Sequence, residues 1–270
     1  MEERSARRRE AATSRSDPPD RGTAAYIGEF VGTFALVFFI TAAVSLYVPP
    51  PVSPGLGAQA IQPFIDFSVI GLVHVFLLFF LIQTLAVISG AHFNPAVTLG
   101  LTALREIKPG DAGVYIAVQV AGGILGALLT KALLLDEGGP VNYGATLVSD
   151  RLDGAILPGM VCELIGTFVL VWAIVGVAVN PRAAKDWAAL VIGGTLGLGV
   201  MVMAPLTGAG FNPARSFGPA LVSGEFGGAG EFLLVYVIAP ILGAVLAAVA
   251  YTSLVVEPGK KEPGGIGPVG

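Results

Sequence analysis

The chain has 270 residues, of which 54% are hydrophobic and 13% are charged, about half the charged fraction of an ordinary soluble domain. Eleven of the 34 charged residues lie in the first 21 positions and four in the last 14, so residues 22–256 carry only 19. So few charges exclude a soluble globular enzyme and an electrostatic nucleic-acid binder, and a single cysteine excludes a disulfide framework. The composition indicates an all-α polytopic membrane protein.

Nearly uncharged stretches mark the membrane spans, because a helix that crosses a bilayer needs about 20 apolar residues. Four stretches fit one helix each, at residues 25–48, 112–130, 154–181 and 232–256. Two others, residues 67–104 and 187–224, are 38 residues long, which is too long for one crossing and too short for two.

Each of the two long stretches contains an Asn-Pro-Ala triplet about ten residues before its end. Proline suits the first turn of a helix, and asparagine suits the N-cap before it. We therefore predict a full span, a turn and a half-helix in each stretch, at about 66–88 and 95–104 and at about 187–206 and 213–222. The triplets are Asn94-Pro95-Ala96 and Asn212-Pro213-Ala214.

The sequence also repeats. Glu29-Phe30-Val31-Gly32-Thr33 recurs 134 residues later as Glu163-Leu164-Ile165-Gly166-Thr167, and the two triplets are 118 residues apart. Three spans per half force the second half to insert upside down, as in many transport proteins. We predict six transmembrane helices and two re-entrant half-helices in inverted repeats at about 23–135 and 154–256, with disordered tails at 1–22 and 257–270.

The distribution of lysine and arginine predicts the orientation. With six spans, 12 of the 15 basic residues fall on the side that holds both termini, which we therefore assign to the cytoplasm. Only Lys131 and Arg151 lie in the opposite loops, at about 49–65, 131–156 and 223–231. We expect a multi-pass protein of the cell membrane with both termini cytoplasmic.

Non-helical backbone at membrane depth is tolerated only where it is buried or lines a watery cavity, so two symmetric breaks indicate a pore. At each N-cap, the oxygen of Asn94 or Asn212 is expected to accept first-turn N–H groups, which leaves the NH2 pointing off the helix end. Two positive helix ends that meet near the midplane disfavour cations and offer donors to the oxygen of a water molecule.

Three charged residues lie inside the otherwise uncharged spans: Glu29, Glu163 and Arg215. A charge in the membrane costs at least about 2.5–3.5 kcal/mol, so we predict that Arg215 lines the pore and excludes cations, rather than snorkelling. The matched placement of the two carboxylates favours support of the turns before the half-helices, by accepting backbone N–H groups. A proton relay is the alternative.

Two longer motifs carry a family resemblance. His92-Phe93-Asn94-Pro95-Ala96-Val97-Thr98 and Phe211-Asn212-Pro213-Ala214-Arg215-Ser216, with the duplicated Glu-x-x-Gly-Thr, resemble the aquaporin (major intrinsic protein) family over about residues 23–256. The resemblance implies one pore per subunit, a homotetramer in the lipid bilayer, and passive flow of water or small neutral solutes.

The family has a four-residue selectivity filter toward the outer mouth. Ungapped counting from the asparagines implies that the filter here is His74, Val200, Ala209 and Arg215. Strict water channels usually have Phe and His at the first two positions, whereas His followed by Val is similar to plant tonoplast-type channels, which pass water and often ammonia or urea. Without the family resemblance, the favoured interpretation of His74 is a histidine whose hydrogen bonds are satisfied between helices.

The resemblance also implies the rest of the pore wall. Backbone carbonyls would form its polar strip, at Gly90, Ala91, His92, Gly208, Ala209 and Gly210. Leu78 and Leu196, each sixteen residues before an asparagine, would supply the apolar wall, so that water meets few binding sites.

We therefore expect a passive water channel that also passes small neutral solutes such as ammonia. Ser216 and Ala220 stand where glycerol-conducting relatives usually carry Asp and a basic residue, whereas Tyr236-Val237 departs from the aromatic-Trp pair of water channels. The alternatives are a glycerol, urea or ammonia facilitator with little water flow, and an ion-coupled secondary transporter. The sequence contains no pattern typical of an enzyme, a metal site or a cofactor site, and we expect no nucleic-acid partner.

Overall fold

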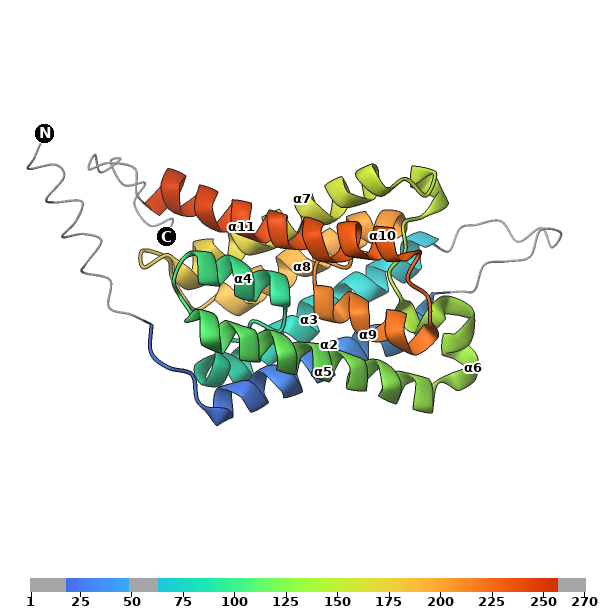
Figure 1. Cartoon of the computed structure of the whole chain (residues 1–270), viewed down its shortest axis with the longest axis horizontal. Helices are drawn as coiled ribbons and strands as arrows, with labels where there is room; N and C mark the ends of the chain where they lie inside the picture. Colours follow the sequence, from blue (N-terminus) through green and yellow to red (C-terminus); the bar gives the residue numbers. More distant parts are fainter. Residues whose placement is uncertain (1–17, 49–62, 257–270) are drawn as a thin grey trace, which may run out of the picture.

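A bundle of tilted helices encloses two short helices in the described part of the chain, residues 18–48 and 63–256 of this computed structural model (Figure 1). The predicted tail at 257–270, most of the predicted tail at 1–22 and most of the predicted loop at 49–65 lie outside the described residues.

Within the described residues, six helices are long and apolar enough to cross a bilayer. Inside a bilayer an uncharged segment folds as a helix, because a helix satisfies its own backbone hydrogen bonds where water is absent. This confirms the six predicted spans. They are α2 (Thr23–Tyr47), α3 (Pro63–Ser89), α5 (Pro109–Leu133), α7 (Ile156–Ile174) with wider turns in η3 (Val175–Val179), α8 (Ala188–Thr207), and a last span of α10 (Ala229–Glu231), η4 (Phe232–Ile238), α11 (Ala239–Tyr251) and η5 (Thr252–Val256).

The two predicted half-helices are α4 (Pro95–Ala103) and α9 (Pro213–Ser223). At 1.5 Å per residue, their 9 and 11 residues cover about half of a hydrocarbon core of about 30 Å. Each begins with a proline at its first position, and α9 is followed by Gly224, whose φ of 82° ends the helix in the left-handed conformation. In Figure 1, α4 and α9 lie one after the other along the middle of the bundle.

The described part of the chain begins and ends at the same end of the bundle (Figure 1). The start of α2 and the end of the last span lie at what we call the terminal end, on the left in Figure 1, and α6 (Leu135–Gly138) and α10 lie at the opposite or far end. The far end also holds η1 (Gly139–Gly144) and η2 (Asp150–Leu152), short elements between the two halves of the chain that the sequence did not predict.

Glycines let the long helices pack backbone against backbone. A Cβ atom added at Gly122 of α5 would lie 2.5 Å from the Phe30 carbonyl oxygen of α2, and one at Gly126 would lie 2.6 Å from the Phe34 oxygen. In the other half of the bundle, a Cβ at Gly193 of α8 would lie 2.5 Å from the Val75 oxygen of α3. Small residues at such crossings are the usual means of close packing in membranes.

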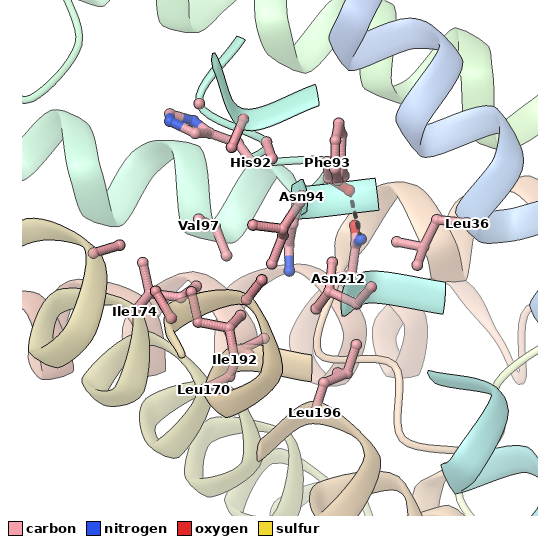
Figure 2. A pocket seen from close by; sticks show the side chains of 18 of the residues that line it. Leu36, His92, Phe93, Asn94, Val97, Leu170, Ile174, Ile192, Leu196 and Asn212 are labelled. Atoms are coloured by element: carbon pink, nitrogen blue, oxygen red, sulfur yellow. Dashed lines mark hydrogen bonds between the residues drawn. The ribbon is translucent and has the colours of Figure 1, made fainter. Parts of the chain in front are cut away.

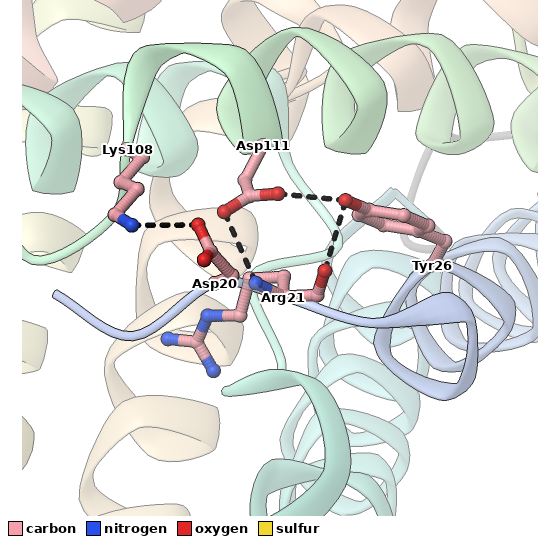
Figure 3. Close-up of polar contacts among 5 residues, drawn as sticks. All are labelled: Asp20, Arg21, Tyr26, Lys108 and Asp111. Carbon is pink, nitrogen blue, oxygen red and sulfur yellow. Dashed lines mark hydrogen bonds and ion pairs between the residues drawn. The ribbon is translucent and has the colours of Figure 1, made fainter.

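Polar contacts tie the segment that enters α2 to the start of α5 (Figure 3). Lys108 Nζ lies 2.6 Å from Asp20 Oδ1, and the backbone N–H of Arg21 donates to Asp111 Oδ2 at 3.1 Å. The Tyr26 hydroxyl lies 2.6 Å from Asp111 Oδ1 and 3.1 Å from the Arg21 carbonyl oxygen. Asp20 and Arg21, near the end of the predicted tail at 1–22, are thus bonded to the bundle.

Candidate pore

The two half-helices meet at their N-terminal ends through Asn94 and Asn212. Each asparagine is the N-cap of its half-helix: Asn94 Oδ1 accepts the N–H of Ala96 at 2.8 Å, and Asn212 Oδ1 accepts those of Ala214 and Arg215 at 3.0 and 3.2 Å. Both side chains are nearly buried, with 5% of their surface exposed. Their oxygens are therefore committed to the helix ends.

The amide nitrogens of the same asparagines bond crosswise between the two halves of the chain. Asn94 Nδ2 donates to the Phe211 carbonyl at 2.8 Å, and Asn212 Nδ2 donates to the Phe93 carbonyl at 2.8 Å, as Figure 2 shows for the second pair. A side-chain amide has two N–H donors, so one donor of each asparagine remains for a guest molecule. The sequence did not reveal these bonds, which join residues more than 110 positions apart.

The turns before the half-helices share one backbone shape. In the first, φ is 87° at Gly90, 54° at Ala91 and 50° at Phe93. Left-handed φ values cost of order 1–3 kcal/mol at a non-glycine residue, so surrounding contacts must hold the turn. The same pattern recurs at offset 118, at Gly208, Ala209 and Phe211.

Glu29 makes such contacts in the first half. Its side chain is fully buried, and its two oxygens accept the N–H groups of His92 at 2.9 Å and Phe93 at 2.7 Å. Gln119 of α5 donates to Oε2 of the same carboxylate at 2.8 Å and to the Thr98 hydroxyl at 3.0 Å. The carboxylate is thus an acceptor for successive N–H groups of the turn.

Glu163 makes the matching contacts in the second half. It is also fully buried, and it accepts the N–H groups of Gly210 at 2.9 Å and Phe211 at 2.6 Å, together with the Thr207 hydroxyl at 2.6 Å. The glycine of the repeated Glu-x-x-Gly-Thr motif is required for a steric reason. A Cβ at Gly32 or Gly166 would overlap the ring of Phe93 or Phe211, respectively.

Two buried tyrosines each donate a hydrogen bond to the carbonyl that precedes one of the turns, a role that the sequence analysis predicted for neither. The Tyr115 hydroxyl donates to the Ser89 carbonyl at 2.6 Å, and the Tyr236 hydroxyl donates to the Thr207 carbonyl at 2.9 Å. The available signal was their position in otherwise uncharged spans, where a buried phenol needs an acceptor.

A cavity of about 380 Å³ lies beside the meeting point of the half-helices (Figure 2). Apolar side chains form much of its wall, including Leu36, Leu170, Ile174, Ile192 and Leu196. Ten of the residues predicted for the pore line it: His74, Leu78, Gly90, Ala91, His92, Asn94, Leu196, Gly210, Asn212 and Arg215. Its wall as described does not include seven other predicted residues: Pro95, Ala96, Val200, Gly208, Ala209, Pro213 and Ala214.

Arg215 lies in the first turn of α9 with only 3% of its surface exposed. Its Nη1 donates to the Gly144 carbonyl of η1 at 2.9 Å, and its Nε has no hydrogen-bond partner among the described residues. His74 lines the same cavity, and its Nδ1 lies 2.7 Å from the Ile70 carbonyl oxygen. Because a carbonyl only accepts, Nδ1 carries a proton, and in the neutral ring Nε2 is an acceptor.

Val200 and Ala209 are almost fully buried, at 1% and 2% exposure, in the apolar cluster that also contains Phe211. His92 Nδ1 lies 3.1 Å from the Thr98 hydroxyl of α4, and its ring stands edge-on to that of Tyr115. Within residues 18–48 and 63–256, no three His, Cys, Asp or Glu side chains gather closely enough to hold a metal ion.

The chain is similar to known proteins in both sequence and fold. Residues 20–251 match the family described as Major intrinsic protein. The chain is 37% identical over 247 residues to Aquaporin AqpM of Methanothermobacter marburgensis, covering 86% of this chain and 97% of that protein. It is 35% identical over 225 residues to Nodulin-26 of Glycine max, covering 83% of this chain and 75% of that protein.

A solved structure supports the fold. The X-ray structure of the aquaglyceroporin from Plasmodium falciparum matches with a TM-score of 0.70 at 24% identity, over 87% of this chain and 97% of that one. With the family match over most of the chain, the expected resemblance is confirmed and an enzyme is ruled out. The chain belongs to the major intrinsic protein family, the aquaporin-type membrane channels.

Proposed function

We propose that this channel conducts water passively, excludes ions and protons, and also passes small neutral solutes such as ammonia. The crosswise bonding of Asn94 and Asn212 carries this proposal. It leaves one amide donor from each half-helix beside a largely apolar cavity, where the oxygen of a water molecule can accept these hydrogen bonds. The described residues that line the cavity include no carboxylate that would hold the water molecule in place. The positive helix ends disfavour a cation at the same point.

The proposed filter is His74, Val200, Ala209 and Arg215. The Nε2 of neutral His74 is an acceptor and Arg215 is a donor, so together they can replace hydrogen bonds that a water or ammonia molecule loses on entry. Val200 and Ala209 are small, which favours a wider and less polar passage than a strict water filter.

We assign the remaining predicted residues to the same pore. Carbonyls of Gly90, Ala91, His92, Gly208, Ala209 and Gly210 form its polar strip, and Leu78 and Leu196 its apolar wall. Glu29 and Glu163 support the two turns, because the N–H groups that they accept would otherwise be unsatisfied at membrane depth. The proposed assembly is a homotetramer in the cell membrane, with the terminal end in the cytoplasm.

Light scattering from vesicles that contain the purified protein tests this function. We expect a sucrose gradient to shrink them many times faster than empty vesicles, and ammonia to cross faster than glycerol. Glycerol or urea entry without accelerated shrinkage would instead favour the facilitator. Uptake that depends on an ion gradient would favour the secondary transporter.

Mercurials test the proposed position of Ala209. Cys162 is the chain's single cysteine, and it is not among the described residues that line the cavity, so we expect weak inhibition of the unmodified protein. In a Cys162→Ser background, Ala209→Cys is expected to lose most of its water flux to a mercurial and to regain it with a thiol reductant. An uninhibited double variant would contradict the assignment of Ala209, as would strong wild-type inhibition abolished by Cys162→Ser.

A further inference from the structure

Lys131 lies in the last turn of α5 at the far end of the bundle, and it touches two elements at once. Its Nζ donates to the Val222 carbonyl at 3.0 Å, and it stands over the ring of Tyr143 at 5.3 Å from the centroid. Val222 is in the last turn of α9, where helix carbonyls lack partners within the helix and the dipole favours a cation. A cation over an aromatic face is attracted by the ring as well.

Of the two elements that Lys131 touches, one carries Arg215 and the other accepts a hydrogen bond from it. One is α9, which carries Arg215 in its first turn. The other is η1, in which Tyr143 precedes Gly144, the residue whose carbonyl accepts Arg215 Nη1 at 2.9 Å. A single lysine therefore connects the helix of the donor to the loop of the acceptor.

On the loop side, the backbone at the end of η1 has an unfavourable conformation. Asn142, Tyr143 and Gly144 have consecutive φ values of 51°, 49° and 73°. Two of these residues have side chains, which disfavour the left-handed region, so contacts from outside the loop must hold the bend. The described contacts of Tyr143 include the lysine and a hydrogen bond from its hydroxyl to the Leu135 carbonyl at 3.3 Å.

On the helix side, α9 is held by close packing against α5 near the pore. A Cβ at Gly123 of α5 would lie 2.6 Å from the Ala214 carbonyl oxygen, next to Arg215, so α5 and α9 touch backbone to backbone there. Lys131 is eight residues further along α5 and closes the same helix pair at the other end of α9. At the other partner, Gly144 of η1 supplies the hydrogen bond described for the guanidinium.

We propose that Lys131 is a positioning residue for Arg215: by holding the end of α9 and the Tyr143 ring together, it keeps the Gly144 carbonyl where the guanidinium needs it. The inference rests on the proposed role of Arg215 in the filter. Without the lysine, the loop relaxes and the guanidinium loses its fixed place. The passage then discriminates less between water, larger neutral solutes and protons.

The test compares Lys131→Met, which keeps the apolar stem but removes the donor and the charge, with Lys131→Arg, which keeps a cation over the ring. Lys108→Met is the matched control, because Lys108 stands at the opposite end of the same helix and pairs with Asp20. Each protein is reconstituted in equal amount, and the urea-to-water permeability ratio and the proton leak are measured together with the melting temperature.

We expect Lys131→Met to raise the ratio and the proton leak at least about threefold at an unchanged melting temperature, Lys131→Arg to restore both, and Lys108→Met to match the wild type. Tyr143→Leu, which removes the ring but keeps the bond to Val222, is expected to change both quantities in the same direction and serves if Lys131→Met fails to fold. Wild-type values in these variants would overturn the inference. A wild type that passes urea but no water would instead overturn the proposed function, and Lys131 would then be judged on the urea flux and the proton leak.

Discussion

Replacing Arg215 by valine is expected to make the channel leak protons and small cations while water still passes. The guanidinium is a buried charge in the first turn of α9, where it adds to the positive end of the helix. Two like charges about 4–5 Å apart repel by about 3–4 kcal/mol at an effective dielectric constant of 20. Because about 1.4 kcal/mol corresponds to a tenfold change in rate, we expect the proton leak to rise about 100- to 700-fold.

A pH-sensitive dye trapped in the vesicles, with a potassium diffusion potential to drive the flux, measures this leak. Arg215→Lys is the control, since it keeps the charge but loses the planar fork that reaches Gly144. We expect its proton leak to stay far below that of the valine variant, with only the small rise that a displaced charge causes, and its solute ratio to differ from that of the wild type. A valine variant as proton-tight as the wild type would assign the barrier to the half-helix dipoles alone.

Replacing Glu163 by alanine is expected to unfold the second half of the channel. The change leaves the N–H groups of Gly210 and Phe211 without their acceptor in a dry interior, whereas the Thr207 hydroxyl can still donate to the Met203 carbonyl at 3.5 Å. Each orphaned donor costs about 1–3 kcal/mol, so the total is about 2–6 kcal/mol, which reaches the lower end of the whole stability of a typical domain. Glu163→Gln is expected to be milder but still destabilising, because its NH2 group would face the same donors.

The fraction of monodisperse protein after heating in detergent gives the melting curve for these variants. Glu225→Ala is the matched control, since this exposed carboxylate accepts only the nearby Gly227 N–H at 3.3 Å among the described hydrogen bonds. We expect it to change stability by less than about 0.5 kcal/mol. An alanine at position 163 with a wild-type melting curve would mean that Glu163 does not support the turn.

Local features of the sequence were enough to predict the spans and half-helices. The charge-free stretches and the two Asn-Pro dipeptides located each element to within a few residues, because bilayer thickness and proline geometry act on contiguous sequence. The paired carboxylates were identified in the same way, since a charge inside an apolar span requires a specific reason.

Contacts between distant segments could not be predicted in this way. The bonds of Asn94 to Phe211 and of Asn212 to Phe93 join the two inverted halves, and nothing local to either residue specifies its acceptor. The Gly144 carbonyl opposite Arg215 lies in a loop with no helical or strand periodicity. Lys131 was counted only as one of two basic residues in the far loops, because its partners come from two other elements.

The filter residues were assigned by counting positions from the two asparagines without gaps. His74 and Arg215 line the cavity, whereas Val200 and Ala209 are buried away from the part of it that the described residues outline. The likeness of this filter to tonoplast-type channels therefore stays a prediction, and the solute panel and the Ala209→Cys variant are its tests.

Water flux and proton flux measured in the same wild-type vesicles test the central claim most directly. The account predicts that the protein accelerates osmotic shrinkage many-fold over empty vesicles while the proton leak stays at the level of empty vesicles. Shrinkage no faster than in empty vesicles, or a proton flux that rises in step with the water flux, would contradict it.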